Sequence, residues 1–171
     1  MGLNLFVASG LQFFVSSSFS KSFSLYGERV GALSIVTASR DESSRVLSQL
    51  NRLVRTNHSK PPIHGAPIVA AVLSDAALRA EWEGELAAMR DRIRTMRSGL
   101  VEALKANGVK QDFAFVTKQR GMFSYTGLSS AQVAVLQSEF GIYAVSTGRI
   151  CLAALNQRNV DYVAKAIAQV L

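Results

Sequence analysis

Apolar residues recur with two different periods along the chain, which predicts a mixture of helices and strands. Between Leu78 and Leu104 the apolar side chains return every three or four positions, so they share one face of a long helix. Residues 12–15 and 30–37 form short apolar runs with the length of buried strands. The whole apolar stretch 3–15 is too short to span a bilayer, and we therefore expect a buried segment there.

The remaining pattern predicts further helices and a second set of strands. Helices are expected over 41–55, 63–73, 129–140 and 156–171, and strands over 113–117, 122–126, 143–145 and 150–153. The strands 113–117 and 122–126 are expected to pair with each other. Side chains expected to cap helices are Asp41, Ser74, the Ser129 and Gln132 pair, and Asn156. The elements together indicate an α/β chain in two parts, with the long helix as the connector.

The formal charge of +7 raises the alternative of a basic, nucleic-acid-binding fragment. Its best support is Arg90, Arg94 and Arg97, which fall on one face of the long helix. Acidic residues are interspersed among them, as on an ordinary solvated helix, and the chain carries no RNA-binding signature. We therefore expect no nucleic-acid partner.

Cysteine and histidine usage argues against disulfide or metal chemistry. Cys151 is the single cysteine, so it cannot form an internal disulfide, and we expect it to be a buried apolar side chain. His58 and His64 lie six positions apart across two prolines, which is not a metal-ligand spacing. The chain shows no secretory signal, and the expected compartment is a reducing cytoplasm with no membrane partner.

The chemistry is concentrated in residues 16–31, which read SSSFSKSFSLYGERVG. This segment resembles the cofactor-lysine motif of class I aminotransferases, with Ser18, Lys21 and Arg29 at the matching positions. The resemblance implies that Lys21 holds pyridoxal phosphate as a Schiff base, then serves as the base that moves a substrate proton. A lysine amine attacks an aldehyde only when it is deprotonated, so we expect a desolvated or electropositive pocket around it. Arg29 and Ser18 would bind the cofactor phosphate.

Two other interpretations of the motif remain. A serine-rich stretch containing glycine is often a solvated loop without chemistry. Ser18-Phe19-Ser20-Lys21 also fits the Ser-x-x-Lys motif of penicillin-binding acyl transferases, but the companion motifs Ser-Asp-Asn and Lys-Thr-Gly are missing. The length of the aminotransferase match favours the cofactor-lysine interpretation over both of these alternatives.

Three further residues acquire roles only through the resemblance, which runs along essentially the whole chain. Arg149, in Ser-Thr-Gly-Arg, matches the arginine that binds the substrate α-carboxylate as a fork-to-fork pair. Arg55 matches an arginine that reaches into the partner subunit and binds the distal carboxylate of a dicarboxylic substrate. Phe123 matches a position in the substrate pocket. Cys151 and Ala154 depart from the family, which commonly has an asparagine and a glycine there.

The resemblance also implies the architecture and the partners. Residues 1–87 would be the C-terminal part of the large cofactor-binding domain, and residues 88–171 the small α+β domain. The full-length enzyme would be a homodimer that transfers amino groups from aromatic or dicarboxylic amino acids to a 2-oxo acid. Complete family members carry much of the cofactor cradle upstream of the lysine, where this chain has twenty residues. We therefore expect little or no activity from the chain alone, and a non-catalytic remnant is the alternative.

Overall fold

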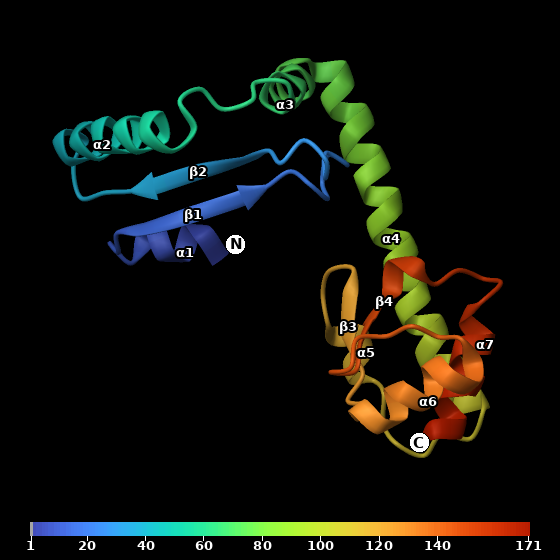
Figure 1. The fold of residues 1–171 in the computed structure, drawn as a ribbon. Helices are drawn as coiled ribbons and strands as arrows, with labels where there is room; N and C mark the ends of the chain where they lie inside the picture. Colours follow the sequence, from blue (N-terminus) through green and yellow to red (C-terminus); the bar gives the residue numbers. More distant parts are fainter. Residues whose placement is uncertain (1) are drawn as a thin grey trace. The chain divides into compact units, whose positions relative to one another are not determined.

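The computed structural model describes residues 2–171 and separates them into two compact units. Unit 1 extends to Glu83 and unit 2 runs from Gly84 to Leu171. The boundary falls inside the predicted long helix, which is present as α4 (Ala76–Ala106) (Figure 1). A domain boundary after residue 87 would lie in the same helix.

Unit 1 contains one β-hairpin, with a helix before it and further helices after it. Its elements are α1 (Gly2–Ala8), β1 (Phe13–Ser18), β2 (Gly31–Val36), α2 (Arg40–His58), α3 (Gly65–Ser74) and the start of α4. Strands β1 and β2 pair antiparallel from Phe13 opposite Val36 to Ser18 opposite Gly31. Helix α2 begins at a side-chain cap, because Ser39 Oγ accepts a hydrogen bond from the Glu42 amide. The two predicted strands and the first predicted helix are therefore confirmed.

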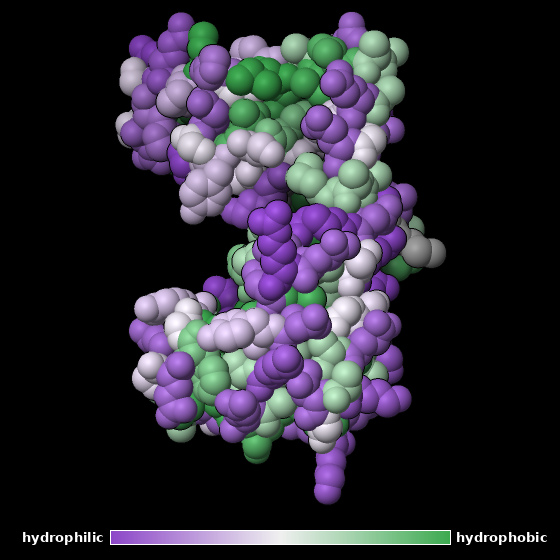
Figure 2. Space-filling view, turned by 90° about the vertical axis from the view of Figure 1, so that its right-hand side faces the viewer, coloured by the Kyte–Doolittle hydropathy of each residue, from purple (hydrophilic) through white to green (hydrophobic). Residues whose placement is uncertain are grey.

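The expected burial of residues 3–15 is wrong for this chain. Residues 2–8 form a helix, and the apolar side chains remain in solvent: Leu5 is 68% exposed and Phe14 is 71% exposed. Apolar side chains at the surface of unit 1 are seen in green in Figure 2. An apolar run shows which residues favour burial, but not whether another part of the same chain covers them.

Unit 2 is built around a continuous apolar core. After α4 come α5 (Phe115–Lys118), β3 (Phe123–Tyr125), α6 (Ser130–Phe140), β4 (Arg149–Cys151), the 3₁₀ turn η1 (Leu152–Ala154) and α7 (Val160–Val170). The predicted apolar face of α4 enters this core through Met96, Leu100 and Leu104. Strands β3 and β4 pair antiparallel, with Phe123 opposite Cys151 and Tyr125 opposite Arg149.

The predicted pairing of strands 113–117 and 122–126 is wrong. Phe113 and Val116 are both buried at helical spacing, and the segment forms the short helix α5. The Asp112 carboxylate accepts a hydrogen bond from the Ala114 amide and so turns the chain at this point. Strand β3 pairs with β4 instead, which leaves residues 143–145 as irregular chain rather than the predicted strand.

Three of the four predicted helix caps are also wrong. Ser39, not Asp41, caps α2. Asp75, not Ser74, caps α4, because its Oδ1 accepts from the amides of Ala77 and Leu78. Asn159, not Asn156, occupies the N-cap position before α7, and it makes no side-chain cap bond. Several capping residues stand close together at each of these helix starts, and the local pattern cannot choose among them. The capping box of Ser129 and Gln132 is confirmed.

Candidate functional site

The loop that carries Lys21 connects β1 to β2. A hydrogen bond from the Phe19 amide to the Val30 carbonyl, 3.2 Å long, closes its base. Inside the loop the Phe23 amide donates to the Phe19 carbonyl and the Ser24 amide donates to the Lys21 carbonyl. Ser24 and Arg29 both have positive φ, 55° and 53°, which is uncommon for residues other than glycine. The loop is therefore a series of tight turns.

Lys21 and Arg29 meet at the ring of Tyr26. The Lys21 Nζ lies 4.3 Å from the ring centroid, and the Arg29 Cζ lies 5.4 Å from it. Arg29 Nη1 also donates to the Tyr26 carbonyl at 3.1 Å, which uses one of its five donors. The structure thus brings the amine and the guanidinium, eight residues apart in the sequence, to the same tyrosine ring. Tyr26 is a site residue that the sequence analysis missed.

Ser18 stands at the end of β1, beside the entrance to the loop. Its hydroxyl donates to the Ser20 hydroxyl at 3.1 Å and accepts from the Ser20 amide. Ser20 is buried, whereas Ser18 and Lys21 are exposed. The described residues therefore supply an electropositive neighbour for Lys21, but not the desolvation that we expected around its amine.

Two contacts from outside the loop hold it in place. The Trp82 indole, in the first part of α4, donates to the Ser22 carbonyl at 2.7 Å and stacks on Phe23 with 4.6 Å between the ring centroids. At the start of α3, a Cβ on Gly65 would stand 2.9 Å from the Val30 Cβ, so the backbone there approaches the loop closely. The sequence analysis assigned Trp82 only to the apolar face of the long helix. Its position against Ser22 and Phe23 of the Lys21 loop required the tertiary fold.

Arg149 and Phe123 line one cavity in unit 2. The Arg149 guanidinium lies over the Phe123 ring, with 4.8 Å from its Cζ to the ring centroid. The cavity measures about 360 Å³, and its wall includes Tyr143, Val145 and Cys151. Cys151 is half-buried there. The predicted substrate arginine and pocket aromatic are thus adjacent, on the paired strands β4 and β3.

Gly148 shapes the backbone just before Arg149. Its φ of +80° is in the region that favours glycine, and an added Cβ would stand 2.6 Å from the Leu128 carbonyl oxygen. Its own carbonyl accepts from both the amide and the hydroxyl of Thr126. The backbone at Gly148 therefore lies closer to Leu128 than a residue with a side chain would allow.

Arg55 lies apart from these contacts. It is exposed in the last turn of α2, where its Nη1 donates to the Ser59 carbonyl at 3.3 Å. A cation at this position is favoured by the helix dipole. Within unit 1, the structure does not bring Arg55 into contact with Lys21.

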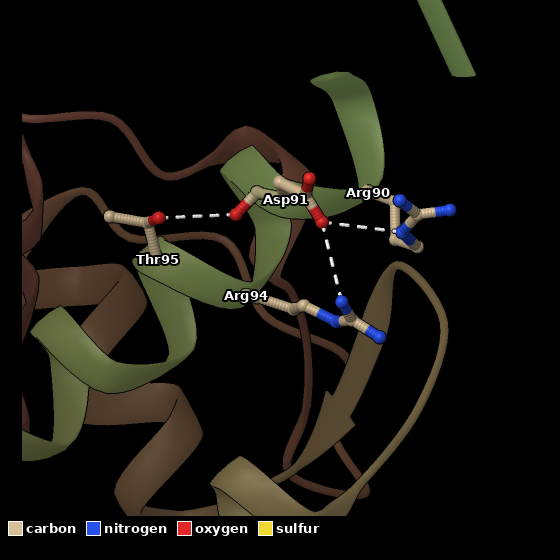
Figure 3. A network of polar contacts seen from close by, with 4 residues as sticks. All are labelled: Arg90, Asp91, Arg94 and Thr95. Atoms are coloured by element: carbon tan, nitrogen blue, oxygen red, sulfur yellow. Dashed lines mark hydrogen bonds and ion pairs between the residues drawn. The ribbon is translucent and has the colours of Figure 1, made fainter. Parts of the chain in front are cut away.

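The arginines of α4 differ from the expected solvated face. Arg90 and Arg94 are exposed and both donate to the Asp91 carboxylate, at 3.2 and 3.3 Å (Figure 3). Arg97 is 3% exposed and is surrounded by hydrogen-bond acceptors of unit 2. Helical spacing placed the three on one face, but only the packing of residues 113–124 against α4 buries Arg97.

Within residues 2–171 no group of three His, Cys, Asp or Glu side chains could hold a metal ion. His58 and His64 are exposed, one in the last turn of α2 and the other just before α3. None of the helices in this part of the chain is both long and apolar enough to cross a lipid bilayer.

The chain belongs to the aminotransferases of class I and II, because the model of that family matches residues 2–167. An aspartate aminotransferase of Pseudomonas aeruginosa is 68% identical over 99% of the chain, and an aromatic-amino-acid aminotransferase of Escherichia coli is 52% identical over 96%. The fold is that of a Burkholderia pseudomallei aromatic-amino-acid aminotransferase covalently bound to pyridoxal phosphate, with a TM-score of 0.96 and 69% identity over 99% of the chain.

These relatives are considerably longer than the chain. It spans 42% of the Pseudomonas protein, 41% of the Escherichia coli protein and 42% of the Burkholderia chain. The similarity thus covers nearly all of the chain and less than half of each relative.

Proposed function

We propose that the chain supplies the cofactor lysine and the substrate-carboxylate arginine of an aminotransferase that acts on aromatic or dicarboxylic amino acids and 2-oxo acids. The family and its relatives support the reaction class. The observation that carries the proposal is the convergence of Lys21 and Arg29 on Tyr26, within a loop whose motif matches the family.

The residues of this loop fit pyridoxal phosphate. The cofactor supplies an aldehyde and an electron-withdrawing ring when it is bound. Lys21 provides the amine that the aldehyde requires, and Arg29 keeps donors free for the phosphate after its single bond to Tyr26. The Ser18 hydroxyl can rotate from Ser20 toward a phosphate oxygen. After release from the cofactor, the Lys21 amine would take the proton from the substrate Cα.

The cavity of unit 2 indicates which of its residues would bind the substrate. Arg149 would bind the α-carboxylate through two parallel hydrogen bonds, and Phe123 supports its guanidinium from one side. Apolar wall residues such as Val145 suit an aromatic side chain better than a charged one. Arg55 would bind the distal carboxylate of a dicarboxylic substrate across a homodimer interface of the complete enzyme.

We also propose that residues 1–87 belong to the large cofactor-binding domain and residues 88–171 to the small domain of that enzyme. The two compact units support this division. A cytoplasmic location is proposed with it. Because the chain spans about two-fifths of its relatives, we expect little or no transaminase activity from it alone. Steady turnover of aspartate with 2-oxoglutarate would contradict that expectation.

Site-selective labelling tests the role of Lys21. The chain is incubated with pyridoxal phosphate at limiting concentration and reduced with borohydride, and the modified lysine is identified by mass spectrometry. Lys21 should carry most of the label, because Arg29 and Ser18 concentrate the phosphate beside it. Lys118, an exposed lysine of α5, is the internal comparison.

Variants separate specific capture from general lysine reactivity. Arg29→Met should lower labelling of Lys21 to about that of Lys118, since an arginine–phosphate pair stabilises binding by roughly 1.5–3 kcal/mol. Arg40→Met removes another exposed arginine of unit 1 and should change nothing. Equal labelling of all lysines in the unaltered chain would overturn the proposal.

A further inference from the structure

Arg97 occupies the interior of unit 2 although it is always charged. Its Nη1 donates to the Val116 carbonyl at 2.9 Å and to the Ser124 hydroxyl at 3.0 Å. Its Nη2 donates to the carbonyls of Gly121 and Phe123, both at 2.8 Å. One planar group thus joins α4 to α5, to Gly121 in the loop after α5, and to β3. Both ends of the guanidinium fork are used.

These contacts reach β3 from one side, whereas the cavity lies on the other. Ser124 is 1% exposed and turned toward Arg97, while the neighbouring Phe123 is 43% exposed and carries Arg149 over its ring. Successive side chains of a strand point to opposite faces. Arg97 therefore binds the Phe123 carbonyl and fixes the backbone of β3 from the side opposite the cavity. The ring of the same Phe123 supports Arg149 on the cavity side.

Gln119 completes the attachment of β3. Its Oε1 accepts from the Ser124 hydroxyl at 2.6 Å and from the Tyr125 amide at 2.9 Å, and its Nε2 donates to the Tyr125 carbonyl at 3.0 Å. Tyr125 is the residue paired with Arg149 in the sheet. Each residue of β3 is thereby held by a side chain from outside the strand.

The acceptors around Arg97 are all neutral. No ion pair to Arg97 is found within the described part of the chain, whereas Arg90 and Arg94 share the Asp91 carboxylate in the two preceding turns of α4. Burial, and to a smaller extent the nearby Arg120, lowers the pKa of Arg97. A buried charge without a counterion is costly. Its four hydrogen bonds offset this cost only while residues 116–124 keep their present conformation.

We propose that Arg97 is a positioning residue for the carboxylate site. It holds β3 so that the Phe123 ring keeps the Arg149 guanidinium in one orientation toward the cavity. The inference rests on the proposed role of Arg149. A carboxylate is bound through two parallel hydrogen bonds only if the guanidinium plane is already oriented, so a freely moving Arg149 would bind it less tightly.

Arginine NMR tests the inference on the complete chain. In ¹⁵N-labelled protein, the Arg149 Nε–Hε signal should show an upfield ring-current shift from Phe123 and restricted motion on the nanosecond scale. Arg97→Lys keeps the charge but cannot donate as a fixed fork to four acceptors. This variant should lose the ring-current shift and increase the mobility of Arg149.

Binding of 3-phenylpropionate to the same samples gives a functional readout. This probe has a carboxylate and an aromatic ring but no amine, so it reports the Arg149 cavity and not Lys21. We expect Arg97→Lys to raise the dissociation constant of the probe about five- to tenfold. The reason is that a less well oriented Arg149 would lose part of its charge-assisted pair with the carboxylate of the probe. Arg94→Met, a matched change one turn earlier on α4, should leave both the signal and the affinity unchanged.

Two further variants guard against a purely structural explanation. Val133→Ala weakens the core of unit 2 away from β3 and should not move the Arg149 signal. Ser124→Ala removes one Arg97 contact with little loss of volume, so it should loosen Arg149 partially even if Arg97→Lys does not fold. An Arg149 signal and a probe affinity that are unchanged in folded Arg97→Lys, or an unchanged signal in Ser124→Ala, would overturn the inference.

The same experiment separates this inference from the proposed function. If the unaltered chain binds no 3-phenylpropionate at Arg149, the carboxylate role fails and the positioning role fails with it. If the unaltered chain binds the probe and the Arg97 variants bind it equally well, only the positioning role fails. Labelling of Lys21 is independent of both results.

Discussion

Except for Arg55, the proposed functional cations contact aromatic rings, and the described residues give them no carboxylate partner. Lys21 and Arg29 share the Tyr26 ring, and Arg149 lies over Phe123. Each such contact stabilises by roughly 0.5–1 kcal/mol at an exposed site. A carboxylate partner would compete with an anionic ligand for the guanidinium donors. An aromatic ring contacts the face of the guanidinium and leaves the N–H donors at the guanidinium edge free. This arrangement orients the cations and keeps them available for a phosphate or a carboxylate.

Gly148 gives a residue-scale prediction. Gly148→Ala should lower the free energy of unfolding of unit 2 by about 2–4 kcal/mol, because it combines the cost of positive φ with a Cβ 2.6 Å from the Leu128 oxygen. Urea denaturation followed on unit 2 amide resonances measures the loss. Gly127→Ala is the matched control, since its φ is +81° but nothing stands within 4 Å of the added Cβ. It should cost about 1–2 kcal/mol, and equal losses would show that the close contact has no effect.

At the scale of elements, the position of the Lys21 loop depends on helices that follow it in the chain. Trp82 of α4 binds the loop through Ser22 and Phe23, and Gly65 lets the start of α3 approach Val30. The β1–β2 hairpin defines where the loop begins and ends. The conformation of the loop therefore requires tertiary contacts from residues 35 to 60 positions away in the chain.

Trp82→Phe tests this dependence on α4. The variant keeps an aromatic ring beside Phe23 but loses the indole donor to the Ser22 carbonyl, a net loss of about 0.5–1.5 kcal/mol. Amide hydrogen exchange of Phe23 and Ser24 should become faster, because opening of the loop costs less. Tyr162→Phe removes a comparable bond to the Phe140 carbonyl in unit 2 and should leave these two amides unchanged. Unchanged exchange in Trp82→Phe would refute the anchoring role.

At the scale of the molecule, the two units differ in how much apolar surface they bury. Among the described residues, the buried apolar side chains are concentrated in unit 2, whose core runs from Met96 to Ile167. In unit 1 Val69 is buried, while Leu5, Phe14 and Leu33 are more than half exposed. Burial of apolar area is the main favourable contribution to folding. Unit 1 should therefore be the less stable part of this chain.

Hydrogen exchange of the unaltered chain checks this difference. Core amides of unit 2, such as those of Leu100 and Ile167, should exchange only through global opening of that unit. Amides in the β1–β2 ladder should exchange at least about tenfold faster, because each 1.4 kcal/mol of stability corresponds to a factor of ten. Equal protection in the two units would contradict the unequal cores.

The sequence by itself determined the parts that depend on local pattern. The apolar period of α4, the strands β1 and β2 and the capping box at Ser129 follow from residue spacing. The motif around Lys21 and the arginine at 149 followed from resemblance, and the family assignment confirms that resemblance. Such features can be predicted from the spacing of neighbouring residues or from a motif that matches a known family.

Tertiary structure alone decided the features that join distant segments. It paired β3 with β4, turned residues 115–118 into a helix, buried Arg97 and placed Trp82 against the Lys21 loop. It also left the apolar residues near the N-terminus exposed. The physical reason is common to all of these: a local pattern states which groups favour burial or need hydrogen-bond partners, and only the folded chain determines which distant groups satisfy them.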